Sequence, residues 1–383
     1  MTGDARRHIL VYRDRLVPRS EVHFLRRLYI GFERLSPVWV GRRRDAGLPE
    51  LGAAPVFLGG PGPRGAVERL LFKQFGILPA APDLRAWRPA VVHAHFGRGG
   101  ALALPIARAL GVPLVVTFHG GDATKDRNYS PWLPTVFARR LAALQREAAL
   151  FVCVSDFIRE QLILRGFPQE KLRVLHYGVE RADDPEPGAA LPSRYVLFAG
   201  RLVEKKGVTH LIEALQRLEG GGQADRQDLQ LVIVGDGPAA PELKKQAAPL
   251  GNVCFRGWMP NRELRRWMRG ALAVCVPSVR AEGGDAEGLP NVVIEAMAEG
   301  AVVVGSRHAG IAEAIEHERT GLLVPPEDPE AIAAALRRLI GDPALRRRLG
   351  ANARAAAAEQ FDALTQSRRL EELLVAVADS GPR

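Results

Sequence analysis

Short runs of β-branched and apolar residues alternate with longer stretches of helical periodicity along almost the whole chain. Strands that alternate with helices are joined by crossover connections, which favour parallel sheets covered by helices. The pattern therefore predicts an α/β protein. In the first half of the chain the predicted strands are Ile9–Tyr12, Val38–Val40, Ala54–Leu58, Ala90–His93, Leu114–Thr117, Leu150–Val154 and Arg173–Leu175. In the second half they are Tyr195–Phe198, Leu229–Val234, Val253–Phe255, Ala273–Val276, Val302–Val304 and Leu322–Val324.

The 383 residues suit two domains of ordinary size, and 47% of them are hydrophobic, which is ample for two cores. A proline-rich polar segment over residues 181–192 interrupts both patterns and is interpreted as an interdomain linker. We predict a first domain over residues 1–185, a second over residues 193–360 and a C-terminal segment over residues 361–383. A helical pattern over Ala363–Val377 is expected to pack on either domain.

Positive charge is concentrated in the first half of the sequence. Residues 1–150 hold 23 lysines and arginines against 11 acidic residues, a balance of +12, whereas the whole chain carries +10. Such a surface suits an anionic lipid surface or a polyphosphate partner, and nucleic acid is the less favoured option. Because arginine greatly outnumbers lysine throughout, compositional bias is the alternative explanation. The candidate residues are Arg26, Arg27, Arg42, Arg43, Arg44, Arg64, Arg69, Lys73, Arg85 and Arg88.

The apolar runs of the sequence are short. Val112–Phe118 is among the longest and falls far below the roughly 20 residues that a membrane-spanning helix needs. The N-terminus shows no long apolar stretch or cleavage site of the secretory kind, so a cytoplasmic protein is expected. Cys153, Cys254 and Cys275 each lie in an apolar segment without a neighbour at metal-ligand spacing and are interpreted as core residues.

Two glutamates, Glu287 and Glu295, flank a point where a loop turns into a helix. Pro290 is tolerated in a first helical turn, so a helix is predicted from Asn291 to Met297. The free amides of residues 289–292 would face a bound anion such as a diphosphate, because helix N-termini carry unsatisfied N–H groups and partial positive charge. Each glutamate could then hold one neutral end of such a ligand, a sugar or a ribose. The alternative is chance, since many chains contain two solvated glutamates eight apart.

A turn with two cations follows the strand predicted at Tyr195–Phe198. The segment Ala-Gly-Arg-Leu-Val-Glu-Lys-Lys-Gly, residues 199–207, places Arg201 and Lys206 at the carboxyl end of a sheet, where open α/β folds bind ligands. A guanidinium and an ammonium could neutralise a diphosphate without a metal. No Asp-x-Asp or clustered His, Asp and Glu set is visible, so no metal site is predicted. Two ordinary loop cations are the alternative interpretation.

Several segments resemble the family-4 retaining glycosyltransferases. Val276–Gly300 resembles the E-x7-E region of that family, and residues 199–207 resemble its G-R-L-x-x-x-K-G element. Further similar segments are Val-Gly-Asp-Gly-Pro at 234–238, Phe-Arg-Gly-Trp-Met at 255–259 and Thr-Phe-His-Gly-Gly-Asp at 117–122. The resemblance covers most of residues 90–330. It implies two Rossmann-like domains facing a cleft, the B-type glycosyltransferase architecture, with the last helix crossing back to the first domain.

The resemblance also implies an activity and roles for individual residues. The enzyme would transfer a sugar from a UDP-, GDP- or ADP-sugar to a hydroxyl with retention of configuration and without a cofactor, on a lipid-linked or glycan acceptor in exopolysaccharide or surface glycan biosynthesis. Arg201 and Lys206 would stabilise the departing diphosphate, where charge develops as the bond breaks. Glu287 and His119 would contact the sugar from opposite walls. The donor-binding residues would be Gly200, Gly235, Trp258, Gly288, Leu289, Asn291 and Glu295.

Residues on the acceptor side are implied less directly. Residues 16–22 resemble the S-E-x-F variant of exopolysaccharide-type members, and this resemblance places Ser20 and Glu21 on the acceptor side. Asp122 is a candidate for contact with the sugar or the acceptor. His93 and His95 are expected to point to opposite faces of a strand, which argues against a shared metal. Both are treated as structural, with a place in the acceptor cleft as the alternative for His95.

Two rival functions exist for the same sequence. One is a nucleotide-sugar epimerase or a phosphorylase on the same fold, which the missing pyridoxal-lysine context disfavours. The other is an inactive nucleotide-sugar-binding module, which the joint presence of the five charged or titratable candidates, His119, Arg201, Lys206, Glu287 and Glu295, disfavours.

Overall fold

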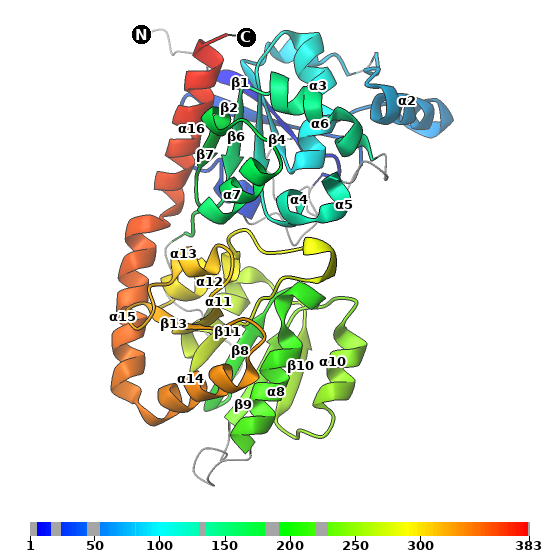
Figure 1. Cartoon of the computed structure of the whole chain (residues 1–383). Coiled ribbons are helices and arrows are strands. Elements are labelled where there is room, and N and C mark those ends of the chain that lie inside the picture. The colour runs from blue at the N-terminus through cyan, green and yellow to red at the C-terminus, as the bar shows by residue number, and fades with distance from the viewer. Residues whose placement is uncertain are drawn as a thin grey trace. The chain divides into compact units, whose positions relative to one another are not determined.

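The chain divides into two compact units in a computed structural model that describes residues 6–16, 24–43, 54–80, 82–129, 135–180, 191–219 and 229–381. The first unit consists of residues 1–178 and 363–383, and the second of residues 179–362. Each is a sheet with helices packed around it (Figure 1). Residues 181–190 of the predicted linker lie outside the described residues.

The sheet of the first unit is parallel throughout its described strands. Its strand order is β3-β2-β1-β4-β5-β6-β7. The central strands are buried along their full length, as expected for a parallel sheet covered on both faces. The strands are β1 (Arg7–Tyr12), β2 (Leu35–Gly41), β3 (Val56–Phe57), β4 (Val91–His95), β5 (Leu114–Phe118), β6 (Leu150–Cys153) and β7 (Leu172–Val174).

The helices of the first unit begin where local sequence signals place them. Ser155 caps α7 by accepting the amide of Ile158, and Thr135 caps α6 through Ala138. Gly76 and Gly111 end α2 and α3 in the left-handed conformation that glycine favours. The helices are α2 (Gly62–Phe75), α3 (Gly97–Leu110), α4 (Gly121–Thr124), α5 (Asp126–Tyr129), α6 (Val136–Glu147) and α7 (Asp156–Leu164).

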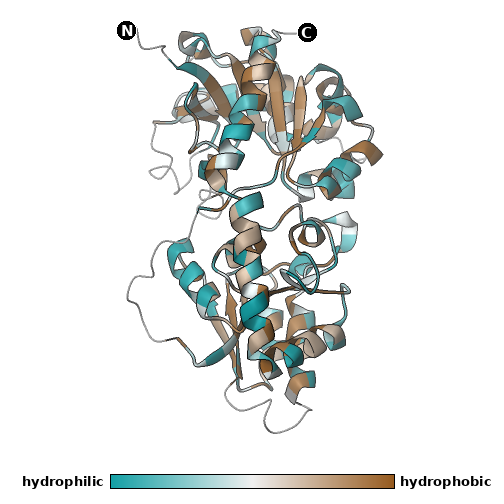
Figure 2. Cartoon of the chain, turned by 90° about the vertical axis from the view of Figure 1, so that its left-hand side faces the viewer, coloured by the Kyte–Doolittle hydropathy of each residue, from teal (hydrophilic) through white to brown (hydrophobic). Residues whose placement is uncertain are grey.

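The second unit is built on a parallel sheet in the order β10-β9-β8-β11-β12-β13. Figure 2 shows hydrophobic residues concentrated in the strands of both sheets. The strands are β8 (Arg194–Ala199), β9 (Leu229–Val234), β10 (Val253–Gly257), β11 (Ala273–Val276), β12 (Val303–Ser306) and β13 (Gly321–Val324). The helices are α8 (Val208–Glu219), α10 (Ala240–Ala247), α11 (Asn261–Gly270), α12 (Asn291–Ala298), α13 (Ile311–Ala314), α14 (Pro329–Gly341) and α15 (Pro343–Gln360).

The strand predictions are confirmed: every predicted strand overlaps an observed one, and the pairing is parallel. The main core of the second unit lies between its sheet and helices α8 and α14, where Leu211, Leu215, Ile233 and Leu336 are fully buried. Burial of each such side chain contributes about 1.5–3 kcal/mol, so these helices and the sheet stabilise one another.

The C-terminal helix α16 (Ala363–Asp379) belongs to the first unit. Ser367 Oγ accepts the amide of Gly31 at 2.9 Å and donates to the carbonyl of Leu28 at 2.9 Å. The buried carboxylate of Glu371 accepts three consecutive amides, those of Glu33, Arg34 and Leu35, at 2.8–3.1 Å. These amides precede or begin β2, so α16 supplies hydrogen-bond acceptors to the partly buried backbone that leads into this strand.

Replacement of Glu371 by alanine should lower the free energy of unfolding by about 2 kcal/mol, because the buried amide of Leu35 and the partly buried amides of Glu33 and Arg34 lose a charged acceptor. Glu372→Ala is the matched control, since Glu372 is the exposed neighbour on the same helix. Urea unfolding monitored by circular dichroism measures both variants. Equal losses in the two would contradict a stabilising role for the carboxylate.

Candidate functional site

The loops that follow β8, β9 and β10 are hydrogen-bonded to one another at the carboxyl edge of the second sheet. Gly200 N donates to Val234 O at 3.0 Å, and Gly235 N donates to Gly257 O at 2.7 Å. Gly235 has φ of 126°, and a Cβ there would lie 2.0 Å from Gly200 O. Only glycine fits this approach, so the predicted importance of Gly235 has a backbone cause.

The loop after β8 also packs against the loop after β11. It contains a short 3₁₀ turn, Glu204–Lys206, which ends at Gly207 in the left-handed conformation. A Cβ on Gly207 would lie 1.9 Å from Pro277 O, and Val279 N donates to Lys205 O at 2.9 Å. The two contacts hold both lysines of the turn beside the connection that leads to Glu287.

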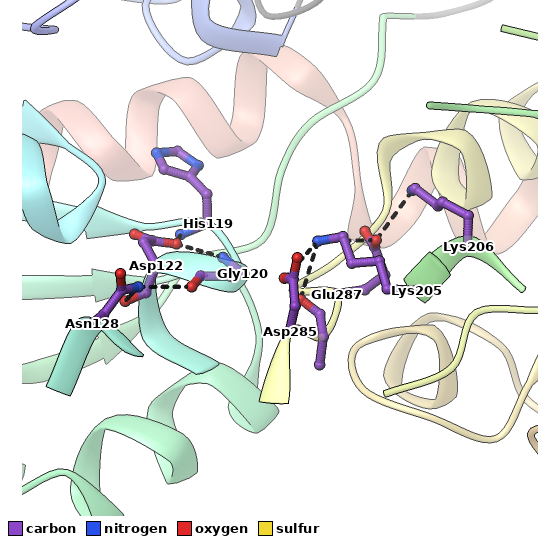
Figure 3. Close-up of polar contacts among 10 residues, drawn as sticks. His119, Gly120, Asp122, Asn128, Lys205, Lys206, Asp285 and Glu287 are labelled. Atoms are coloured by element: carbon purple, nitrogen blue, oxygen red, sulfur yellow. Dashed lines mark hydrogen bonds and ion pairs between the residues drawn. The ribbon is translucent and has the colours of Figure 1, made fainter. Parts of the chain in front are cut away.

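A cluster of four charged side chains joins these two loops (Figure 3). Lys205 Nζ lies 3.2 Å from Asp285 Oδ1 and 3.3 Å from Glu287 Oε1, and Lys206 Nζ lies 3.3 Å from the same Glu287 oxygen. Burial acts to raise the pKa of Glu287, but the ammonium groups of Lys206 and Lys205 outweigh it and hold the pKa below its ordinary value. Glu287 is therefore a buried, ionised carboxylate at neutral pH.

Helix α12 begins at Asn291 as predicted, after Pro290, and no side chain caps its first turn. Its start is held by Gly288, whose carbonyl accepts the amide of Gly310 at 2.8 Å. Just past its C-terminal end, the buried carboxylate of Glu299 pairs with Arg265 at 2.5 Å and Arg269 at 2.6 Å on α11. Anchoring near both ends fixes the position of the uncapped amides.

Polar atoms without a hydrogen-bond partner gather on the connection from β11 into α12. Within the described residues they include Ser278 Oγ, Asn291 Oδ1 and Glu287 Oε1. The contacts of Glu287 Oε1 with the two lysines are ion pairs. Buried polar atoms are nearly always paired with protein, water or ligand. The connection therefore presents several groups that a polar ligand could satisfy.

The structure brings together some of the predicted residues of the second half and leaves others apart. Lys206 and Glu287 are in contact, whereas Arg201 is exposed at the end of β8. Glu295 is buried within α12 and Leu289 is buried just before it. Trp258 is 52% exposed, and its amide donates to Asp236 Oδ2 at 3.0 Å.

Lys205 is a member of the cluster that sequence reasoning missed. It pairs with both carboxylates and donates to Ala286 O at 3.3 Å, so it has more contacts in the cluster than Lys206. Burial acts to lower the pKa of Lys205, but Glu287 and Asp285 outweigh it and raise the pKa. The lysine doublet is visible in the sequence, but which ammonium faces which carboxylate depends on the path of the turn.

In the first unit, His119 and Asp122 lie at the carboxyl end of β5. Asp122 Oδ1 accepts the amides of His119 at 3.0 Å and Gly120 at 2.8 Å, and Oδ2 accepts the amide of Gly97 at 3.0 Å (Figure 3). Burial raises the pKa of Asp122, although these amides act in the opposite direction. The carboxylate thus holds the start of α3 against the turn that carries His119.

The expectation that His93 and His95 point to opposite faces of a strand is wrong. Residues two apart on a strand share a face, and the two rings lie with centroids 4.7 Å apart. Both bond the hydroxyl of Tyr29, from His93 Nδ1 at 2.7 Å and from His95 Nε2 at 2.6 Å. His95 also reaches His119, with Nδ1 and Nε2 3.1 Å apart.

Not every predicted residue can be placed. Ser20 and Glu21 lie outside the described residues, as does Arg44. Two of the basic residues proposed for a charged face are buried, which corrects that prediction: Arg42 pairs with Asp14 at 2.6 Å, and Arg27 is 4% exposed. Within the described ranges no helix is both long and apolar enough to cross a membrane. The same residues contain no group of three or more His, Cys, Asp or Glu suited to a metal ion.

Two family models match consecutive parts of the chain. Residues 34–183 match the model described as Glycosyltransferase Family 4, and residues 179–356 match that of Glycosyl transferases group 1.

Curated relatives include the amylovoran biosynthesis glycosyltransferase of Erwinia amylovora, 33% identical over 69% of this chain and 65% of that protein. The alpha-D-kanosaminyltransferase of Streptomyces kanamyceticus is 32% identical over 69% of this chain and 71% of that protein. The match to the Erwinia protein spans less than two thirds of its length.

Solved structures share the fold. An Anabaena protein in complex with UDP and glucose superposes with a TM-score of 0.76 at 20% identity, covering 97% of this chain and all of that one. The sucrose-phosphate synthase of Thermosynechococcus elongatus gives a TM-score of 0.74 at 21% identity over 98% of this chain and 100% of that one. The fold is thus the B-type glycosyltransferase fold, and with the family matches and the identity to the kanosaminyltransferase it shows that the chain belongs to the family-4 glycosyltransferases.

Proposed function

We propose that this chain is a retaining glycosyltransferase that moves a sugar from a nucleoside diphosphate sugar to a hydroxyl of a lipid-linked or glycan acceptor, in the biosynthesis of an exopolysaccharide or related surface glycan. The family supports the reaction class. The glycan class rests on relatives such as the Erwinia protein, which is named for amylovoran biosynthesis. Relatives named as glycosyltransferases favour this reading over an epimerase or a phosphorylase on the same fold.

The observation that carries the proposal is the connection from β11 into α12. A buried carboxylate flanked by two lysines is followed within a few residues by an uncapped helix N-terminus. Unpaired polar atoms of Ser278 and Asn291 lie on the same connection. A diphosphate suits the ammonium groups and helix amides, while hydroxyl-rich sugar and ribose suit the carboxylates and the side-chain oxygens.

Roles follow for the individual residues. Arg201 and Lys206 stabilise the departing diphosphate, and the three N–H groups of Lys206 allow it to hold a phosphate oxygen while it stays beside Glu287. Glu287 contacts the sugar and Glu295 the ribose hydroxyls. Lys205 holds the 285–287 segment, so it positions Glu287. Gly200, Gly235, Gly288, Leu289, Asn291 and Trp258 complete the donor site.

Roles are also proposed for the candidate residues of the first unit. His119 contacts the donor sugar, while Asp122 and His95 support the turn and the ring of His119 on the acceptor side. Since both carboxylate oxygens of Asp122 already accept backbone amides, its contribution is to hold this turn.

A lipid-linked acceptor would require the protein to reach a membrane surface, and helix α2 of the first unit is suited to that contact. It lies at the edge of its unit (Figure 1) and exposes apolar side chains, among which Phe75 is 71% exposed. The exposed apolar residues of this region are Val67, Leu70, Phe75 and Ile77, and Arg64 and Lys73 lie on the same helix. Exposed apolar side chains insert into a bilayer surface and neighbouring cations attract its anionic headgroups, so the two together favour contact with an anionic membrane.

Binding of one of UDP-, GDP- or ADP-sugars should raise the melting temperature by roughly 5–10 °C at saturating concentration, because the ligand binds only the folded state. The proposed site neutralises the diphosphate with protein groups, so the shift should persist in EDTA. Differential scanning fluorimetry with and without EDTA measures both points. No shift with any donor would contradict the proposed function, and a shift that needs added Mg²⁺ or Mn²⁺ would contradict metal independence.

Lys206→Ala and Arg201→Ala should each reduce turnover of the donor found in that screen on the order of 10²-fold, because each removes a charged donor to the leaving group. Lys245→Ala is the control, since Lys245 is an exposed lysine on α10 of the same unit. Release of nucleoside diphosphate is the measured quantity. A loss no greater than that of the control would show that these cations do not act on the leaving group.

The double variant Leu70→Ser and Phe75→Ser should bind anionic vesicles on the order of tenfold more weakly than the unaltered protein, because burial of each side chain contributes about 1.5–3 kcal/mol when complete. Leu164→Ser, on α7 of the same unit, changes a leucine that is 78% exposed and serves as control. Vesicle flotation gives the bound fraction. Equal recovery of unaltered protein with neutral and anionic vesicles, whatever the salt concentration, would argue against membrane association.

A further inference from the structure

Six side chains of the first unit form one continuous line of hydrogen bonds. Thr117 Oγ1 bonds His93 Nε2 at 2.7 Å, and the Tyr29 hydroxyl bonds both His93 Nδ1 and His95 Nε2. His95 Nδ1 bonds His119 Nε2, and His119 Nδ1 bonds the hydroxyl of Tyr177. The order is therefore Thr117, His93, Tyr29, His95, His119 and Tyr177, and both ring nitrogens of every histidine are used.

The three imidazoles of this chain of hydrogen bonds are neutral. His93 and His95 are fully buried, and burial lowers the pKa of His93 to about 3. Burial, together with the charge of Arg13, lowers the pKa of His119 well below its usual value, and the pKa of His95 is lowered likewise. A neutral imidazole has one N–H donor and one acceptor nitrogen, so each ring passes the direction of hydrogen bonding from one neighbour to the next.

Three arrangements place one proton in every link, and only two of them also give the hydroxyl proton of Tyr29 an acceptor. In the first, all three rings carry the proton on Nδ1, Tyr29 donates to His95, and Thr117 donates to His93. In the second, all three carry it on Nε2, Tyr29 donates to His93, and His93 donates to Thr117. A mixed arrangement with both His93 and His95 donating to Tyr29 leaves the Tyr29 proton without an acceptor among the described residues, at the cost of a buried unsatisfied donor.

We propose that Tyr29 is a positioning residue that ties the tautomer of His93 to the tautomers of His95 and His119, which bond each other directly, and so helps decide whether His119 Nδ1 offers a proton or a lone pair to a hydroxyl ligand. His119 is the partly exposed ring of the three and lies at the carboxyl end of β5. A ligand hydroxyl that takes the place of Tyr177 at Nδ1 meets a donor in the first arrangement and an acceptor in the second. This inference rests on the proposed function only in naming the ligand as a sugar hydroxyl.

The coupling can be tested at the end of the chain opposite to His119. Thr117→Val is nearly isosteric and removes the partner of His93 Nε2, so an Nε2–H on His93 would lose its acceptor. We expect His93 to take the Nδ1–H form in this variant and, through Tyr29, His95 and His119 to take it as well. Adding Tyr29→Phe keeps the ring that packs against Phe32 and Trp39 but removes the hydroxyl that carries the coupling.

Long-range ¹H–¹⁵N spectra of full-length protein labelled at histidine distinguish the two tautomers of each ring. The expected result is one shared tautomer for His93, His95 and His119 in the unaltered protein and Nδ1–H for all three in Thr117→Val. When Tyr29→Phe is added, His93 should no longer agree with the other two rings, while His95 and His119 keep a shared tautomer through their direct bond. Different tautomers in the unaltered protein, or agreement of His93 with His95 that survives Tyr29→Phe, would overturn the coupling. If Thr117→Val does not fold, the comparison of unaltered protein with Tyr29→Phe alone still decides the question.

A functional measurement separates this inference from the proposed function. Tyr29→Phe should lower turnover while it leaves the Kd for the nucleoside diphosphate unchanged, because the proposed diphosphate contacts belong to the second unit. Coupled tautomers in a protein that binds no nucleotide sugar would refute the proposed function and leave the coupling intact. Uncoupled tautomers in an active enzyme would refute the coupling and leave the proposed function intact.

Discussion

Glu287 is buried in the second unit, and the two lysines beside it allow its carboxylate to stay charged there. An isolated buried carboxylate would take up a proton instead of keeping its charge. The pair of ammonium groups reverses this tendency, so a charged oxygen persists next to the start of α12. Much of the local backbone serves this arrangement: Gly207 allows the lysine turn to touch Pro277, and Lys205 O accepts the amide of Val279. Moving either loop would separate the charges.

The first unit organises its candidate histidines without charge. Their line of tyrosine, threonine and histidine side chains is largely buried, neutral and fully hydrogen-bonded, whereas the second unit concentrates ionised groups. The difference suits the ligand groups proposed for each unit. A diphosphate is recognised by fixed cations and helix amides, while sugar hydroxyls are recognised by groups that can either donate or accept.

Much of the fold could be predicted because its signals are local. Each strand is a short β-branched run, and the parallel pairing follows from the helices between the strands. The start of α12 at Asn291 follows from Pro290 in the same way. The hydrogen bonds of Glu371 to residues 33–35 could not be predicted, because they join segments more than 330 residues apart and a surface glutamate has the same sequence pattern.

The same distinction explains which site residues were found and which were missed. Lys206 and Glu287 stand in recognisable motifs, whereas Lys205 became visible as a member of the cluster only once the path of its turn was known. Tyr29 and Tyr177 lie outside the recognised motifs. They reach His95 and His119 only because the segment before β2, the ends of β4 and β5, and the segment after β7 come together in the fold. The error on His93 and His95 had a different origin, since the period of a strand already places residues two apart on one face. That period puts the two rings together, and the place between them is open to a shared hydrogen-bond partner. The hydroxyl of Tyr29 occupies that place, and it makes two otherwise structural histidines part of the surroundings of His119.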